Sequence, residues 1–221
     1  MYSVGNWTVH FMNARGELTP YIDTVQKALE DVHERSKPLV PTTILDIEVE
    51  AARYGGVPNI GHSGYVPRPG LMRLMLDPYD ENLAQNLGEP MGRMIAHELH
   101  HALRWDTVGY GTTLIGALVS EGLCGKFTAE LYGNNPEQQE CAIPADQIQC
   151  LSREALVEAH SEDYDHDRWF FGKKDLPNWA GYTIGFELVG LAMESMKLNP
   201  SEMIAIPAEE FIGSLETLCG V

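Results

Sequence analysis

The hydrophobic periodicity of the chain changes once, between residues 80 and 90, and this change constrains the fold more than any other feature. Before it, apolar and polar residues alternate, most clearly over Leu45–Ala51, as in strands with one buried face. From about Pro90, apolar residues recur every three or four positions, which is the period of amphipathic helices. Strands followed by helices are typical of the α+β class. We therefore expect a single domain over residues 1–221, with a small N-terminal sheet in 1–80 and helices in 81–221.

Turn and capping residues divide the chain into elements. The predicted strands cover residues 6–12, 45–51 and 71–76. The predicted helices begin at Thr19-Pro20 and then cover residues 90–105, 112–132, 152–160 and 179–197, with a last helix beginning near Ala208. Residues 54–70 hold five glycines and three prolines and are predicted to be mostly loop. Residues 162–178 are predicted to be a long connection.

The charge balance narrows the range of partners. The chain has 15 basic and 32 acidic residues, and its formal net charge is −17 at pH 7. Such a surface repels nucleic acid and anionic lipid, so we expect neither as a partner, and metal cations are favoured. No apolar run approaches the roughly 20 residues that span a bilayer. The N-terminal residues lack the basic and apolar regions of a secretory signal, which predicts a cytoplasmic protein.

Four cysteines occur without a CxxC pair, at positions 124, 141, 150 and 219. In a cytoplasmic protein such cysteines are expected to be reduced thiols. The alternative is a single bridge between Cys141 and Cys150 around the loop that separates them.

The segment AHELHHALRW, residues 96–105, carries the residues that indicate chemistry. Four residues turn a helix by about 400°, so His97 and His101 lie about 40° apart and one turn along the helix. Two imidazoles in this arrangement can bind one zinc ion. Glu98, the next residue, can take a proton from a water molecule at the metal.

The same helix has a predicted core face and a predicted solvent face. The core face holds Met91, Ile95, Leu99, Ala102 and Leu103. The solvent face holds Arg93, His100 and Arg104, so His100 is expected at the surface. His97 and His101 fall at the border between the faces, where ligands of a metal in a cleft belong.

A catalytic zinc site needs a third protein ligand, and Glu121 is the preferred candidate. It is the only acidic residue in the apolar stretch 113–127, where an unpaired carboxylate is costly to bury. Gly122 and Gly125 are expected to let this helix pack closely against the helix of residues 90–105. The competing ligands are Asp106 and Glu130.

These motifs and the segments around them resemble those of a known family. The HExxH segment, followed about 20 residues later by the glutamate of SEGL, is similar to the gluzincin arrangement of thermolysin-like metallopeptidases. The segments AHELHHALRW, TLIGALVSEGLCGKF and WAGYTIGFELVG resemble the predicted zinc-dependent proteases of domain-of-unknown-function family 2268. The resemblance covers about residues 71–211 and is strongest over residues 94–127.

The resemblance implies a zincin-like fold with an HExxH active-site helix. It implies His97 and His101 as zinc ligands, Glu121 as third ligand and Glu98 as base. It also implies an edge strand beside that helix, which can hold an extended peptide. Leu71–Leu76 is the strand that we expect there.

Hydrolysis of a peptide bond at such a site passes through a tetrahedral oxyanion, and this oxyanion requires a hydrogen-bond donor. Tyr182, at the start of the helix of residues 179–197, is the preferred candidate, because a phenol donates without adding charge. His160, His166 and Arg168 are alternatives, but they lie in or beside the acidic stretch SEDYDHDR, where a charge-compensated loop is expected.

Together these features predict a gluzincin-type zinc metallopeptidase with one zinc ion per chain and a peptide or protein substrate. Glu98 and Tyr182 are the predicted catalytic residues, and His97, His101 and Glu121 are the predicted ligands. One alternative is a zinc-stabilised binding or regulatory module without turnover, although a purely structural site does not require Glu98. Another is hydrolysis of a non-peptide amide by the same residues.

Overall fold

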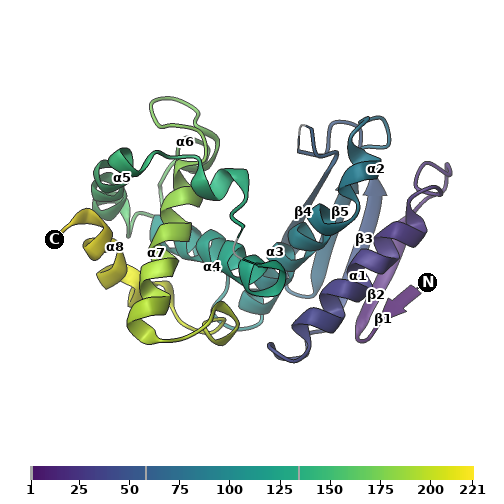
Figure 1. Ribbon diagram of the computed structural model, residues 1–221, viewed down its shortest axis with the longest axis horizontal. Coiled ribbons are helices and arrows are strands. Elements are labelled where there is room, and N and C mark those ends of the chain that lie inside the picture. The colour runs from purple at the N-terminus through teal and green to yellow at the C-terminus, as the bar shows by residue number, and fades with distance from the viewer. Residues whose placement is uncertain (1, 58, 134) are drawn as a thin grey trace. The chain divides into compact units, whose positions relative to one another are not determined.

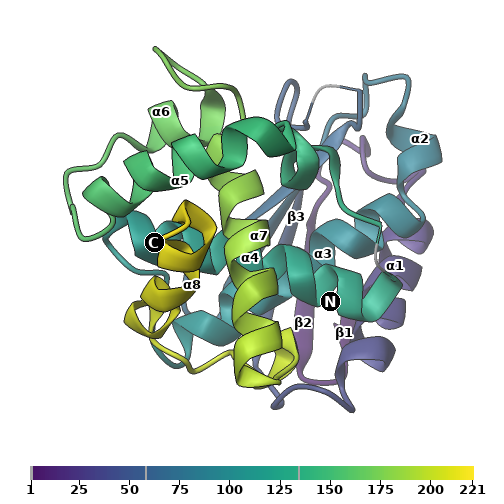
Figure 2. The same ribbon diagram turned by 60° about the vertical axis from the view of Figure 1, so that its left-hand side comes forward.

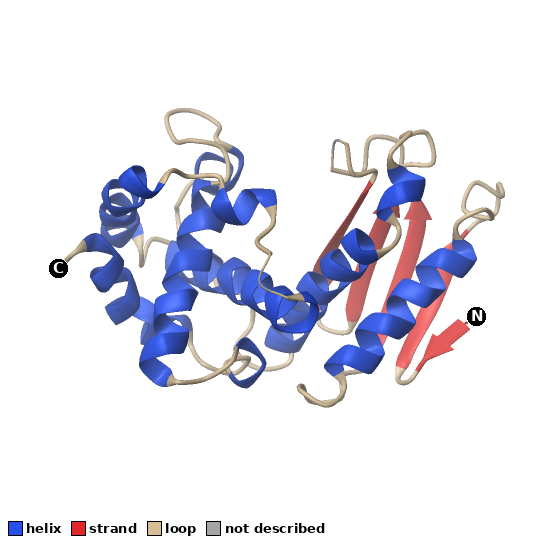
Figure 3. Ribbon diagram, in the orientation of Figure 1, coloured by secondary structure: helices blue, strands red, loops and turns tan. Residues whose placement is uncertain are grey.

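The computed structural model describes residues 2–57, 59–133 and 135–221, and the chain folds into two compact units, Met1–Asp106 and Thr107–Val221. All strands of the described residues lie in the first unit, and the second unit is helical (Figure 3). The predicted α+β class is therefore confirmed. The single domain over residues 1–221 stays a prediction.

The first unit contains one five-stranded mixed sheet. In spatial order its strands are β1 (Tyr2–Val4), β2 (Trp7–Met12), β3 (Leu45–Ala51), β5 (Leu71–Leu76) and β4 (His62–Arg68). The three inner strands, β2, β3 and β5, are parallel, and β1 and β4 are antiparallel edge strands. The inner strands are those that the sequence predicted at residues 6–12, 45–51 and 71–76. The short strand β1 was not predicted.

Two predictions about this sheet are wrong, and both concern strand β4. The segment predicted to be loop contains β4, and Leu71–Leu76, predicted to be the edge strand, is an inner strand. Glycine and proline concealed β4 because they are rare in central strands. An edge strand tolerates them: Pro67 falls in the irregular pairing between Tyr65 and Arg68, where no ladder hydrogen bond is needed from its nitrogen.

The two faces of the sheet differ. Figure 1 shows helices α1 (Ile22–Ser36) and α3 (Glu89–Trp105) side by side on one face, with the short helix α2 (Leu83–Asn86) before α3. The opposite face is polar: Arg73 Nε donates to Glu48 at 2.7 Å, and another guanidinium nitrogen of Arg73 donates to the Tyr65 hydroxyl at 3.0 Å. The polar residues of the alternating pattern over Leu45–Ala51 thus lie on this face, as predicted.

Helix α1 begins later than predicted. Its first residue is Ile22, and its N-cap residue Tyr21 makes no side-chain capping bond. Thr19, predicted to be the cap, instead accepts a hydrogen bond from the Asn13 side chain at 2.9 Å. The local capping preference of threonine was outweighed by this contact within the loop.

The second unit consists of helices. They are α4 (Leu114–Tyr132), α5 (Ala145–Glu158), α6 (His166–Phe171), α7 (Ala180–Met196) and α8 (Ile212–Cys219), with short 3₁₀ helices at Gln138–Cys141, Pro200–Glu202 and Ala208–Phe211. Helix α6 interrupts the predicted connection 162–178, because the Asp165 side chain caps it by accepting from the Arg168 amide at 3.0 Å. In the described parts of the chain, no helix has both the length and the apolar character needed to cross a membrane.

Helices α4 and α7 form the most extensive helix contact of the second unit, and Figure 2 shows α7 running across α4. They approach most closely at two glycines. A Cβ on Gly122 would lie 2.1 Å from the Gly185 carbonyl oxygen, and one on Gly185 would lie 2.3 Å from the Leu118 carbonyl oxygen. The prediction that Gly122 and Gly125 face the helix of residues 90–105 is wrong: Gly122 contacts α7, and Gly125 lies against Glu140 and Phe186.

We expect Gly185→Ala to destabilise the chain, because the added methyl meets backbone atoms that cannot move independently of α4. Overpacking of this kind costs about 1–3 kcal/mol or more of the free energy of unfolding. Urea unfolding followed by circular dichroism measures the change. Gly213→Ala is the matched control, because a Cβ there meets nothing within 4 Å. Equal effects of both substitutions would contradict the packing described.

Candidate functional site

Helix α3 carries His97 and His101 on one side. The helix begins at Glu89, directly after Gly88, and has a proline in its first turn, where proline favours the start of a helix. The centroids of the two imidazole rings are 4.9 Å apart, and the ring planes meet at 73°. His101 is buried and His97 is partly exposed. Two neighbouring imidazoles are a donor set that suits zinc, so these residues fit the metal that the sequence predicts.

Glu98 lies against the edge strand of the sheet. Its side chain is buried, and its Cγ would lie 2.7 Å from a Cβ placed on Gly64 of β4. The C-terminal end of α3 is also joined to β4, since Trp105 Nε1 donates to the Val66 carbonyl at 3.2 Å. The general-base candidate is therefore held between its own helix and an edge strand.

The predicted solvent face of α3 is not exposed. Arg93, His100 and Arg104 are all buried, and His100 has no exposed surface. The prediction that His100 lies at the surface is wrong. The prediction assumed that only one face of the helix is covered, but α3 packs against α1 as well as against β4 and β5.

Glu121 is a buried acid on α4, in the second unit, and Tyr110 binds it. The Tyr110 hydroxyl donates to Glu121 Oε1 at 2.6 Å, and the hydroxyl of Ser120 donates to the Tyr110 carbonyl at 2.9 Å. Burial first, and then the charge of Glu121, hold the pKa of Tyr110 well above its usual range. Tyr110 thus stays protonated and remains a donor to the carboxylate.

Tyr164, just before α6, and His166, its first residue, lie near Glu121 in the second unit. Burial lowers the pKa of His166, against the opposing effect of the nearby Glu121 charge, so its imidazole is neutral at pH 7. The hydroxyl of Tyr164 lies 3.1 Å from His166 Nδ1. When Tyr164 donates to Nδ1, the ring proton is on Nε2, which leaves this nitrogen as a neutral donor. The ring stacks on Phe170 at 4.4 Å.

The predicted oxyanion donors have different surroundings. Tyr182 packs edge-on against Phe170 at 5.1 Å and is close enough to Tyr110 to raise the pKa of that residue. His160 is exposed in the turn after α5. Arg168 forms ion pairs with three carboxylates, those of Glu154, Glu158 and Asp175. Arg168 therefore compensates charge, as expected for this stretch.

Other acids that could replace Glu121 as a ligand are engaged elsewhere. Asp106, at the end of α3, is exposed and accepts from the Thr43 hydroxyl at 2.9 Å. Glu130 accepts from both the amide and the hydroxyl of Ser201, at 3.1 and 2.8 Å. It thereby holds the 3₁₀ helix Pro200–Glu202 on α4.

All four cysteines are free thiols. Cys141 and Cys150 are exposed and unbridged, in agreement with the predicted reduced state and against the alternative bridge. Cys124 is buried on α4, one helical turn beyond Glu121. Its thiol is a second group on this helix with the chemistry of a zinc ligand.

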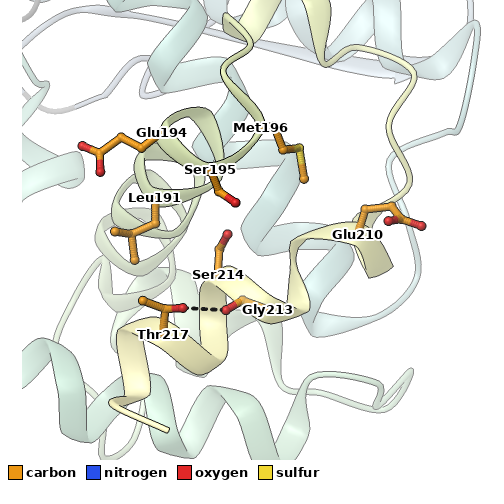
Figure 4. Close-up of a pocket in the computed structure, with 8 residues that line it drawn as sticks. All are labelled: Leu191, Glu194, Ser195, Met196, Glu210, Gly213, Ser214 and Thr217. Atoms are coloured by element: carbon orange, nitrogen blue, oxygen red, sulfur yellow. Dashed lines mark hydrogen bonds between the residues drawn. The ribbon is translucent and has the colours of Figure 1, made fainter.

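A cavity of about 540 Å³ lies between α7 and the C-terminal helices of the second unit (Figure 4). Its described lining consists of carboxylates, hydroxyls and apolar groups, without His, Cys, Lys or Arg. The hydroxyl of Thr217 is already bonded to the Gly213 carbonyl at 2.8 Å. Since none of the predicted site residues lines this cavity, we do not assign the reaction to it.

Sequence reasoning missed Tyr110 and Tyr164. Both stand in segments read as loop, and a single tyrosine in a loop carries no periodic signal. Only their contacts in the folded unit connect them with Glu121 and His166.

A helix with two histidines one turn apart and a glutamate between them is the arrangement found in zinc-dependent hydrolases. The chain belongs to the family described as predicted Zn-dependent protease, domain of unknown function 2268, whose pattern matches residues 22–213. An uncharacterized protein, YjaZ of Bacillus subtilis (strain 168), is 27% identical over 133 residues, which cover 55% of this chain and 49% of that protein. The chain thus matches about half the length of this relative.

We expect Tyr110→Phe to lower the free energy of unfolding by about 1.5–3 kcal/mol, because a buried carboxylate loses a donor. Tyr164→Phe is the comparison: its hydroxyl contacts a neutral imidazole, so the loss should be nearer 1 kcal/mol. Urea titrations of both variants measure the difference. A smaller loss for Tyr110→Phe than for Tyr164→Phe would show that Glu121 does not depend on this bond.

Proposed function

We propose that the protein is a zinc-dependent peptidase of the gluzincin type with a zincin-like fold. The observation that carries the proposal is the pair of adjacent imidazoles on α3 with Glu98 beside them, in a chain of a family described as predicted Zn-dependent protease. His97, His101 and Glu121 are the proposed ligands of one zinc ion per chain.

The chemistry divides between the metal and the side chains. Zinc, when bound, supplies Lewis acidity that polarises the scissile carbonyl and lowers the pKa of water. Glu98 accepts the proton of the attacking water and passes it to the leaving amine. Burial of Glu98 against β4 restricts its rotamers, which favours a fixed geometry for both transfers.

The oxyanion donor is proposed to be Tyr182, with His166 as a second candidate. Both side chains pack on Phe170 in the second unit. His166 gains support from its lowered pKa and from its contact with Tyr164, which together leave a neutral donor. Arg168 is less suited, because three carboxylates already bind its guanidinium.

We propose a peptide or protein segment as substrate and a cytoplasmic location. Strand β4 takes over the role expected for Leu71–Leu76, because it is the edge strand and it contacts α3 at Glu98. An extended peptide can add to an exposed strand edge through backbone hydrogen bonds. The net charge of −17 favours neutral or cationic substrates.

Glu98→Gln tests the proposed base. Glutamine has nearly the same size but cannot accept a proton, so hydrolysis of a peptide library should fall by about 10²–10⁴-fold. Zinc content, measured by elemental analysis, and melting temperature should remain near those of the wild type. A variant that loses zinc and activity in proportion would make Glu98 a ligand or scaffold residue, and a wild type that binds zinc without hydrolysis would favour the non-catalytic module.

Four alanine variants test the third ligand. Glu121→Ala should be isolated largely without zinc, because loss of a ligand weakens binding by more than the roughly 10–100-fold typical of an outer-shell partner. Asp106→Ala and Glu130→Ala are the controls and should retain the metal. Cys124→Ala examines the thiol on the same helix. If Cys124→Ala loses zinc and Glu121→Ala retains it, the site has a cysteine ligand and the gluzincin assignment fails.

A further inference from the structure

The edge strand β4 lies against side chains of α3 at Gly64. A Cβ at this position would lie 2.6 Å from Met94 Sδ, 2.7 Å from Glu98 Cγ and 3.3 Å from Glu98 Cδ. Two of these distances are shorter than real Cβ contacts. Gly64 has no left-handed φ, so the backbone conformation itself would accept another residue. The absence of a side chain is therefore required by the neighbouring side chains of α3.

Strand β4 cannot retreat from α3 to make room. Two residues before Gly64, the ring of His62 donates to the Asn86 carbonyl at 3.0 Å, and two residues after it, the Val66 carbonyl accepts from Trp105 at 3.2 Å. Gly64 itself pairs with Leu74 of β5, a residue with no exposed surface. The strand is thus held by hydrogen bonds of residues 62 and 66, on either side of Gly64, and by its pairing with β5.

The two side chains under Gly64 differ in how they can respond. The contact with Met94 is at its thioether, near the end of a flexible chain, which can move at small cost. The contact with Glu98 is at Cγ, so a methyl group at position 64 forces the carboxylate into another rotamer. A displacement of about 1 Å in a reacting group can cost about 10²-fold in rate.

We infer that Gly64 is a positioning residue that seats the carboxylate of Glu98 for proton transfer. The role rests on the proposed function of Glu98 as general base. The three atoms that a Cβ at Gly64 would meet first belong to Met94 and Glu98 and not to a predicted metal ligand, so we expect the effect to fall on the base. The edge strand thereby fixes the catalytic glutamate through the absence of a side chain.

Gly64→Ala should lower kcat of peptide hydrolysis by about 10–100-fold while KM and zinc content stay near wild type. Met94→Ala combined with Gly64→Ala removes the thioether contact and keeps the contact with Glu98, so its kcat should remain low. Recovery of kcat in this double variant would place the effect in Met94 and overturn the inference. An unchanged kcat in Gly64→Ala would overturn it as well.

A double-mutant cycle in melting temperature supplies a readout that does not depend on turnover. Gly64→Ala should lower the melting temperature by several degrees, because the added methyl group overpacks the contact with α3. In a Glu98→Ala background the loss should shrink, because Cγ is gone. Gly213→Ala, where a Cβ meets nothing within 4 Å, should shift both backgrounds equally.

The outcomes separate the two proposals. A wild-type chain that neither binds zinc nor hydrolyses peptides overturns the proposed function, and with it the role of Gly64. A zinc-binding, active wild type with no coupling between Gly64→Ala and Glu98→Ala overturns only the role of Gly64. Coupling together with a selective loss of kcat supports both.

Discussion

A buried carboxylate on the largely apolar helix α4 is the constraint around which much of the second unit is organised. Burying Glu121 is costly unless donors or a cation compensate its charge. Tyr110 provides one donor at 2.6 Å, and the adjacent Ser120 holds the backbone of Tyr110 in place. The loop before α4 is thus ordered by two consecutive residues of that helix. Tyr164 and His166 complete the surroundings and are sensitive to the charge of Glu121.

Both units use close backbone approach at glycine to bring functional groups together. At Gly122 and Gly185 two helices come near enough for backbone contact, next to Glu121 and one turn after Tyr182. At Gly64 a strand comes close to side chains of the helix that carries Glu98, and a Cβ there would lie 2.6 Å from Met94 Sδ and 2.7 Å from Glu98 Cγ. In each case a methyl group would separate the elements or displace a side chain, because neither backbone can move alone.

The success and failure of the fold predictions have a common physical cause. Strand β3 and helix α3 were predicted because their apolar residues repeat with the period of the element. Strand β4 was missed because its stability comes from pairing with β5 and packing on α3, and its glycines and prolines hide any period. Helix α6 was missed because one capping aspartate, Asp165, and the ion pairs of Arg168 support only a short helix.

The sequence by itself determined that His97 and His101 lie together and that Glu98 stands beside them, because helix geometry fixes the positions of residues within one or two turns. It also singled out Glu121, because an acid in an apolar helix is conspicuous. Only the tertiary structure decided which strand is the edge and which partners Glu121 has. Those depend on contacts between residues distant in sequence, which no local pattern records, since each contact is made only after the elements have packed.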